Sequence, residues 1–262
     1  MTTSENPFRM IGAFLFGLMS ETVTLSLNEL RALLRKSFEG IFAHNHDWNA
    51  LTDLVLWLEF QDLGGLDTFF EAEPSLREAS PRVIQNDNEI VVDGNGASLL
   101  AFNTRACDLL LADVNLNGRG VLHVRNTKNS EVITASVSRC AKQGYAVVAW
   151  WLDREGYAFM ALQNANEAAP SLYKVKVPKT FSSYPDITIL VGREVTDIEN
   201  LYPEWINFRD KAQLSHNQIV DRYEEYLNNG IRLTQADYKR LCHFADRVLV
   251  EATEKSRQGA GE

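Results

Sequence analysis

The sequence is poor in cysteine and has no long hydrophobic run. Three of its 262 residues are cysteines, Cys107, Cys140 and Cys242, and they form no C-x-x-C pair. An odd, sparse set is typical of reduced thiols in a cytoplasmic protein, so we expect neither a disulfide framework nor a metal site. No run reaches the roughly 18 apolar residues of a membrane-spanning helix, so we also expect no membrane partner.

Positive charge is scarce as well. The chain has 26 lysines and arginines against 35 aspartates and glutamates, which leaves a net charge of −9. A protein that binds nucleic acid without sequence preference needs a cationic face, so we expect no nucleic-acid partner. With 45% hydrophobic and 23% charged residues, the composition is typical of a globular chain and excludes a disordered one.

Two amphipathic helices are predicted near the start of the chain. Ser26 and Glu29 have the spacing of a capping box, and apolar residues then recur at helical spacing to about Phe42. A second helix begins after Asp47 and carries an apolar face from Trp48 to Leu58. We expect the two helices to lie side by side as an antiparallel pair.

Strands and helices are mixed in the middle of the chain, and helices return after residue 197. The segment 64–82 is acidic and is predicted to be irregular, and Thr234 is predicted to begin a long helix near the end. The predicted strands are 89–93, 120–125, 145–152, 156–162, 172–177 and 187–191, and the predicted central helices are 97–111 and 131–142.

This order of elements predicts an α+β (mixed α/β) fold. An N-terminal helical pair would be followed by a central mixed sheet with helices packed on it, and then by C-terminal helices. The predicted divisions are an extension over 1–18, a helical part over 19–63, a sheet domain over 64–196, a helical part over 197–256 and a tail over 257–262.

Three short patterns carry weak chemical signals. Gly94-x-Gly96 follows a strand and precedes a helix, but the third glycine of a dinucleotide loop is missing, which favours a simple turn. His44 and His46 are metal-ligand types, yet a third ligand is not evident and the adjacent Asp47 suits a helix cap. His123 lies on a predicted strand, where a half-buried, hydrogen-bonded histidine is the usual state.

Two longer segments carry a family resemblance. The segment 61–70 resembles the Asp-x-Arg-Gly-x-x-Ser-His-Gly motif of the type 2 malate/L-lactate dehydrogenases, and it follows two helices as that motif does. The segment 120–130 resembles the Val-x-Val-Arg-Asn-Ser-x-His-Phe-Gly segment of the same family. The resemblance identifies the chain as a divergent, shortened relative and implies the fold of that family.

The resemblance also implies a degenerate site. Family members transfer hydride between a nicotinamide cofactor and a 2-hydroxy acid, using histidines from both motifs and an arginine. Phe69 and Asn129 stand here at the histidine positions, Gly64 at the arginine position of the first motif, and Glu73 where a second arginine is usual. A phenyl ring and an amide cannot transfer protons near neutral pH, so we expect no 2-hydroxy-acid dehydrogenase activity and no cofactor.

We therefore expect a small-anion-binding or accessory and assembly protein, which forms a homodimer as the family does. One alternative is an NAD(P)-linked oxidoreductase, or another enzyme on a small carboxylate, with a rebuilt active site. Another is a structural partner of an active relative. Arg125 and Lys128 would receive the anion, unless they are simply solvated at the strand end. The candidate ligand-binding residues are Asp67, Thr68, His123, Arg125, Lys128 and Asn129.

Overall fold

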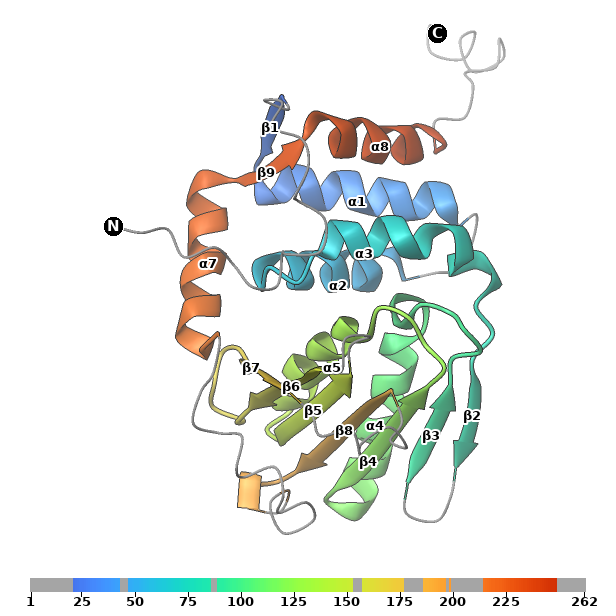
Figure 1. Ribbon diagram of the computed structural model, residues 1–262, viewed down its shortest axis with the longest axis vertical. Helices are drawn as coiled ribbons and strands as arrows, with labels where there is room; N and C mark the ends of the chain where they lie inside the picture. The colour runs from blue at the N-terminus through green and yellow to red at the C-terminus, as the bar shows by residue number, and fades with distance from the viewer. Residues whose placement is uncertain are drawn as a thin grey trace, which may run out of the picture.

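A computed structural model describes residues 21–42, 47–85, 89–152, 157–176, 186–196, 198 and 214–248. Figure 1 shows two parts, a stack of helices and a twisted sheet below it, with α7 (His216–Asn229) along one side. The predicted extension 1–18, the tail 257–262 and the histidines His44 and His46 lie outside the described residues. No helix in the described part of the chain is long and apolar enough to cross a membrane.

The helical stack combines both ends of the described chain. Helix α1 packs on α2 and on α8, and strand β1 pairs with β9 in an antiparallel ribbon (Figure 1). The two helical parts that the sequence analysis treated separately therefore form one layer. The elements are β1 (Thr22–Leu25), α1 (Leu27–Ile41), α2 (Trp48–Phe60), α3 (Gly65–Ala72), β9 (Ile231–Thr234) and α8 (Gln235–Asp246).

Helix ends in this layer follow from the sequence. Ser26 and Glu29 form the predicted capping box of α1, and Asp47 accepts a hydrogen bond from the Ala50 amide at the start of α2. Thr234 caps α8 in the same way. The short β1–β9 ribbon was not predicted, because each strand has only four residues and is recognisable only through its partner.

The second part is a seven-stranded mixed sheet in the order β2-β3-β4-β8-β5-β6-β7. Strands β3 and β4 are parallel and all other neighbours are antiparallel, with α4 packed on β4 and α5 on β5. The elements are β2 (Arg82–Gln85), β3 (Ile90–Asp93), α4 (Asn103–Asn117), β4 (Gly120–Arg125), α5 (Ile133–Ala141), β5 (Ala146–Leu152), β6 (Tyr157–Gln163), β7 (Ser171–Lys176) and β8 (Ile187–Gly192). The predicted mixed α/β class is confirmed.

Two predicted boundaries were wrong. The segment 64–82 is largely helical, since α3 is followed by a 3₁₀ helix over Glu73–Glu78. Gly64, with φ of 68°, begins α3, and a Cβ on Gly65 would lie 2.0 Å from the Val55 carbonyl oxygen of α2. The two glycines thus allow close helix packing instead of breaking the helix. The first central helix begins at Asn103, not at 97, because a short 3₁₀ helix over Leu99–Ala101 precedes it.

Candidate functional site

Five polar residues meet where α3 faces the connection between β4 and α5. The Thr68 hydroxyl donates to Oε1 of Glu131 at 2.9 Å, and Nδ2 of Asn129 donates to Oε2 of Glu71 at 3.0 Å. The Ser98 hydroxyl donates to Oδ1 of Asn129 at 2.7 Å. We call these five residues, Thr68, Glu71, Ser98, Asn129 and Glu131, the polar cluster.

Local geometry brings these side chains together. Thr68 and Glu71 are three residues apart on α3 and therefore share one face of the helix. Asn129 adopts the left-handed conformation, with φ of 56°, a region that asparagine tolerates better than most residues. Its neighbour Lys128 forms a bridge with Ser98 through main-chain hydrogen bonds, which holds the two loops in register.

The environment of the Glu131 carboxyl raises its pKa. Burial raises its pKa above the ordinary glutamate value, and the nearby Glu71 carboxylate raises it further. Hydrogen bonds from its own backbone amide, from Thr68 and from Asn129 act in the opposite direction without cancelling the rise. The polar cluster therefore holds two carboxyl groups, of which one is easily protonated.

No cation compensates these carboxyl groups. Across the described ranges, no histidine, lysine or arginine forms a hydrogen bond or an ion pair with a member of the polar cluster. The donors and acceptors of the cluster are instead directed at one another. As built, the cluster joins α3 to the β4–α5 connection, and none of its five members carries a positive charge.

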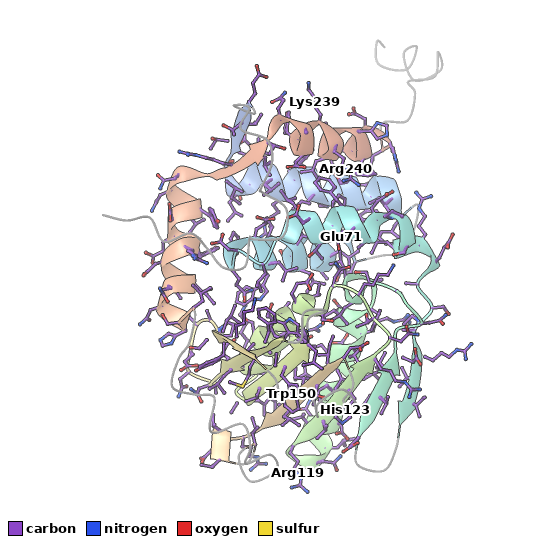
Figure 2. The ribbon with its side chains drawn as sticks, in the orientation of Figure 1. Glu71, Arg119, His123, Trp150, Lys239 and Arg240 are labelled. Carbon is purple, nitrogen blue, oxygen red and sulfur yellow. The ribbon has the colours of Figure 1, made fainter. Side chains whose placement is uncertain are left out.

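The structure brings only two of the predicted ligand-binding residues, Thr68 and Asn129, into this cluster. His123 lies lower, on β4, and Figure 2 shows it well apart from Glu71 of α3. Its Nδ1 is 2.9 Å from the Thr188 hydroxyl and its Nε2 is 3.5 Å from the Glu89 carboxylate. This is the half-buried, hydrogen-bonded histidine expected from the sequence.

The remaining candidates also lie apart. Arg125 forms an ion pair with Asp93 at 3.2 Å, and the exposed Lys128 is held through its main chain. Asp67 faces the other side of α3, where it lines a separate pocket with residues of α7 and β9. The alternative that Arg125 and Lys128 are solvated residues at a strand end agrees with this geometry.

Phe69 and Asn129, the two positions that the resemblance matches to histidines, do not share surroundings. A helix turns by about 100° per residue, so Phe69 points away from the face that carries Thr68. Its ring is fully buried against Phe38 of α1 and Phe244 of α8, at centroid distances of 5.0 and 5.7 Å. Phe69 is a core residue in this structure.

The other two degenerate positions have structural roles too. Gly64 begins α3, and Glu73 begins the following 3₁₀ helix. The Glu73 carboxylate lies 3.6 Å from the guanidinium of Arg247, so it is paired with a cation of the helical stack.

The Gly94–Gly96 segment does not suit a dinucleotide phosphate. The Gly94 amide donates to the Arg125 carbonyl and the Gly96 amide to the Asn126 carbonyl, so neither points at open space. A Cβ on Gly94 would lie 2.9 Å from the Asn126 carbonyl oxygen. This glycine is therefore needed for contact between two loops, and the predicted turn is confirmed.

Metal and thiol chemistry find little support in the same region. In the described part of the chain, no three His, Cys, Asp or Glu side chains are placed to hold a metal ion. All three cysteines are free, as expected, although Cys107 of α4 and Cys140 of α5 lie with their sulfurs 3.8 Å apart in the core. Their separation in sequence gave no sign of this contact.

Sequence reasoning missed three members of the polar cluster, Glu71, Ser98 and Glu131. Glu71 belongs to a segment that was predicted to be irregular, so its helical spacing from Thr68 was not considered. Ser98 and Glu131 meet the others only through tertiary contacts. A helix prediction over 65–72 would have revealed the Thr68–Glu71 face.

Comparison with known proteins identifies the fold. No protein-family model and no curated protein sequence matches the chain. A malate dehydrogenase from Pyrococcus horikoshii superposes with a TM-score of 0.63 and 12% identity, over 88% of this chain and 98% of the other. A malate dehydrogenase from Entamoeba histolytica gives 0.62 and 9%, over 88% and 100%, and a sulfolactate dehydrogenase from Methanocaldococcus jannaschii gives 0.54 and 9%, over 86% and 97%.

These likenesses confirm the fold that the resemblance implied. The chain has the mixed α/β fold of the malate and lactate dehydrogenases, at an identity that is evidence for the fold alone. Because one fold supports many functions, the chemistry must be argued from the side chains of the site.

Proposed function

We propose that the chain is a divergent relative of the type 2 malate/L-lactate dehydrogenases that no longer transfers hydride to 2-oxo acids. It would act instead as a binding or accessory protein. The observation that carries the proposal is the polar cluster, whose hydrogen-bonding groups are paired with one another and whose only ionisable groups are two carboxyls. The proposal does not depend on the buried position of Phe69.

Charge argues against a carboxylate substrate at the polar cluster. At about 4 Å and an effective dielectric constant near 20, two like charges repel by roughly 4 kcal/mol. A 2-oxo acid placed beside Glu71 would meet that repulsion, and no member of the polar cluster carries a positive charge to offset it. Loss of the usual proton donor would reduce the rate by a further ~10²–10⁴.

One observation favours a second candidate, an enzyme with a rebuilt active site that acts on a small carboxylate. The Glu131 carboxyl has a raised pKa and is therefore closer to the proton-donating state than an ordinary glutamate. In this candidate Glu131 would donate the proton that the family's histidine donates. NAD(P) would then be the expected cofactor.

A turnover assay distinguishes the two candidates. NADH and NADPH are incubated with a panel of 2-oxo acids, namely pyruvate, oxaloacetate, 2-oxoglutarate and sulfopyruvate. We expect the same rate with protein as with buffer for every combination. A rate that the protein raises and that Glu131→Gln abolishes would establish the rebuilt enzyme instead.

The expected homodimer and small anionic ligand are also part of this proposal. Closed two-fold dimers are the commonest soluble assemblies, and the dehydrogenase fold is compatible with one. Sedimentation equilibrium of the purified chain should give twice the monomer mass of 29.6 kDa. A monomer at all concentrations would contradict the expected dimer without affecting the argument from the polar cluster.

A further inference from the structure

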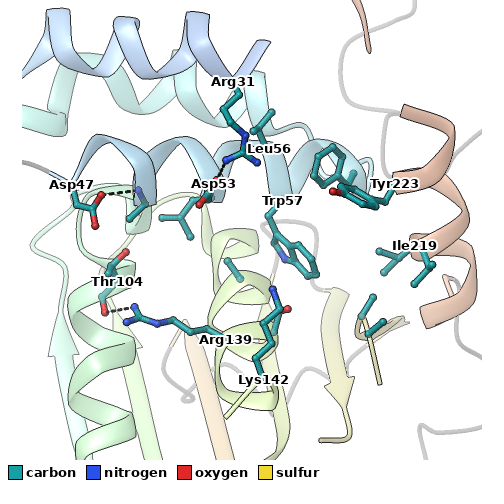
Figure 3. Close-up of a pocket in the computed structure, with 18 residues that line it drawn as sticks. Arg31, Asp47, Asp53, Leu56, Trp57, Thr104, Arg139, Lys142, Ile219 and Tyr223 are labelled. Atoms are coloured by element: carbon teal, nitrogen blue, oxygen red, sulfur yellow. Dashed lines mark hydrogen bonds and ion pairs between the residues drawn. The ribbon is translucent and has the colours of Figure 1, made fainter. Parts of the chain in front are cut away.

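A cavity of about 730 Å³ lies between α2, α5 and α7, and no member of the polar cluster lines it (Figure 3). Its walls are mainly apolar and include two aromatic rings, Trp57 of α2 and Tyr223 of α7. Phe60 supports Tyr223 through an edge-to-face contact with centroids 4.9 Å apart. The volume is within the range of about 300–1,000 Å³ that is usual for small-molecule sites.

Two residues that line this wall each carry a buried polar atom with no hydrogen-bond partner among the described residues. Oγ of Ser138, a residue only 2% exposed, and Nε1 of Trp57 are both buried and unpaired. Leaving such a group unpaired costs roughly 1–3 kcal/mol, so native structures usually satisfy it. The indole N–H can only donate, so the group that completes this wall must offer an acceptor.

The charged groups around the cavity leave one cation without a carboxylate partner. Arg31 is paired with Asp53, Arg139 with Asp108 at 2.6 Å, and Asp47 caps α2. Lys142 lies over the Trp57 ring, with its Nζ 5.8 Å from the ring centroid, and forms no ion pair within the described ranges. The cavity thus combines aromatic walls, two unpaired groups that can donate and one available ammonium group.

We propose that the α2–α5–α7 cavity binds a small aromatic carboxylate. The ring of the ligand would lie against Trp57 and Tyr223, and its carboxylate would face Lys142. Ser138 and Trp57 would donate to this carboxylate once their polar atoms, which solvent does not reach in this structure, turn toward the cavity. An uncharged aromatic molecule would fill the same walls but would leave Lys142 without a partner. A carboxylate satisfies all of these groups at once.

Calorimetric titration of the full-length protein tests this proposal. The probe is naphthalene-2-carboxylate, and naphthalene-2-methanol serves as its uncharged analogue. We expect saturable binding of the carboxylate, with an affinity that falls about tenfold in Lys142→Met and about fivefold or more in Ser138→Ala. The affinity for the alcohol should be the same in Lys142→Met as in the wild type.

Two further variants complete the test. Lys239→Met changes an exposed lysine of α8, a helix that contributes no residue to the cavity wall, and should bind the carboxylate as the wild type does. Ala135→Phe places a ring into the wall from α5 and should abolish binding of both probes, with an unchanged circular dichroism spectrum as the control for folding. Absence of saturable binding, equal affinities in Lys142→Met and Lys239→Met, or normal binding by Ala135→Phe would each overturn the proposal.

This outcome is independent of the proposed loss of dehydrogenase activity. None of the variants alters the polar cluster, and the probes contain no 2-oxo acid. A failed titration would therefore leave the turnover prediction intact, and the converse also holds.

Discussion

The polar cluster and the α2–α5–α7 cavity differ in whether their polar groups have hydrogen-bond partners. In the polar cluster, Thr68, Ser98 and Asn129 donate to or accept from neighbours in the same cluster, so the site is complete without a ligand. In the cavity wall, Ser138 and Trp57 have polar atoms without a hydrogen-bond partner in the part of the chain that the structure describes. The difference favours the cavity over the polar cluster as a ligand-binding site, even though the family resemblance points to the cluster.

The largest expected effect on stability comes from a substitution of Phe69, the core residue next to Thr68 of the polar cluster. Phe69→His would place a polar imidazole in a fully buried position between the rings of Phe38 and Phe244. We expect a loss of roughly 3–5 kcal/mol in unfolding free energy, which urea denaturation can measure. Phe69→Leu is the matched apolar control and should lose much less. A stable Phe69→His protein with wild-type folding would place this side chain at a surface after all.

Breaking the polar cluster at its centre should have the next largest effect. Asn129→Ala removes an acceptor of Ser98 and a donor to Glu71, and it also forces a left-handed backbone on alanine. We expect a loss of about 2–3 kcal/mol, measured by thermal or chemical unfolding. Asn129→Gly tolerates this backbone and should recover part of the loss. No effect in either variant would show that the cluster does not join α3 to the β4–α5 connection.

Two serines on α5 sharpen the comparison directly. The Ser136 hydroxyl donates to Oδ1 of Asn103 at 2.8 Å, whereas the Ser138 hydroxyl has no hydrogen-bond partner among the described residues. Both serines are almost fully buried. Ser136→Ala should lose about 1–2 kcal/mol of unfolding free energy, and Ser138→Ala should be neutral or slightly stabilising without ligand. Equal losses in both variants would mean that Ser138 is paired within the folded chain.

The smallest effect is a pH dependence with a defined sign. Folding raises the pKa of Glu131 above the usual glutamate value of 4.5, mainly through burial, so the folded state binds this proton more tightly than the unfolded chain. The stabilisation from protonated Glu131 is fully present below the pKa that this residue has in the unfolded chain. It is lost as pH rises through the raised pKa of Glu131 in the folded chain. Glu131→Gln should lack this loss when unfolding is measured across pH.

Glu29 supplies a control of opposite sign. Hydrogen bonds with Ser26 lower the pKa of Glu29, so its contribution is present above the unfolded pKa and is lost as pH falls through the lowered value. Glu29→Gln should therefore reduce stability at neutral pH and have little effect at low pH. A wild-type stability that rises with pH wherever Glu131 titrates, and does so equally in Glu131→Gln, would contradict the assignment for Glu131.

The sequence predicted those parts of the fold that depend on local patterns. The capping box at Ser26 and the apolar alternation of β4 need only neighbouring residues to be recognised. Helix α3 was missed because the acidic segment 64–82 was predicted to be irregular. The close approach of α3 to Val55, which Gly65 permits, depends on tertiary packing. Of the predicted site, Thr68 and Asn129 do come together.

The rest of the site could not be predicted for a related reason. Phe69 is adjacent to Thr68 in sequence, but the rotation of the helix sends its ring to the opposite side. The cavity is lined by residues from α1 to α7 that no sequence motif connects, and its unpaired Ser138 is indistinguishable in sequence from the paired Ser136.

Hydrogen–deuterium exchange with two ligands tests most directly whether the cavity, and not the polar cluster, is the ligand-binding site. The protein is labelled alone, with naphthalene-2-carboxylate and with NADH. Protection from exchange is compared between two sets of residues. The first set, 54–60 and 135–142, contains residues that line the cavity, and the second set, 68–71 and 129–131, contains members of the polar cluster. We expect the carboxylate to protect the first set and NADH to protect neither set. Protection of the second set by NADH, with none of the first by the carboxylate, would contradict it.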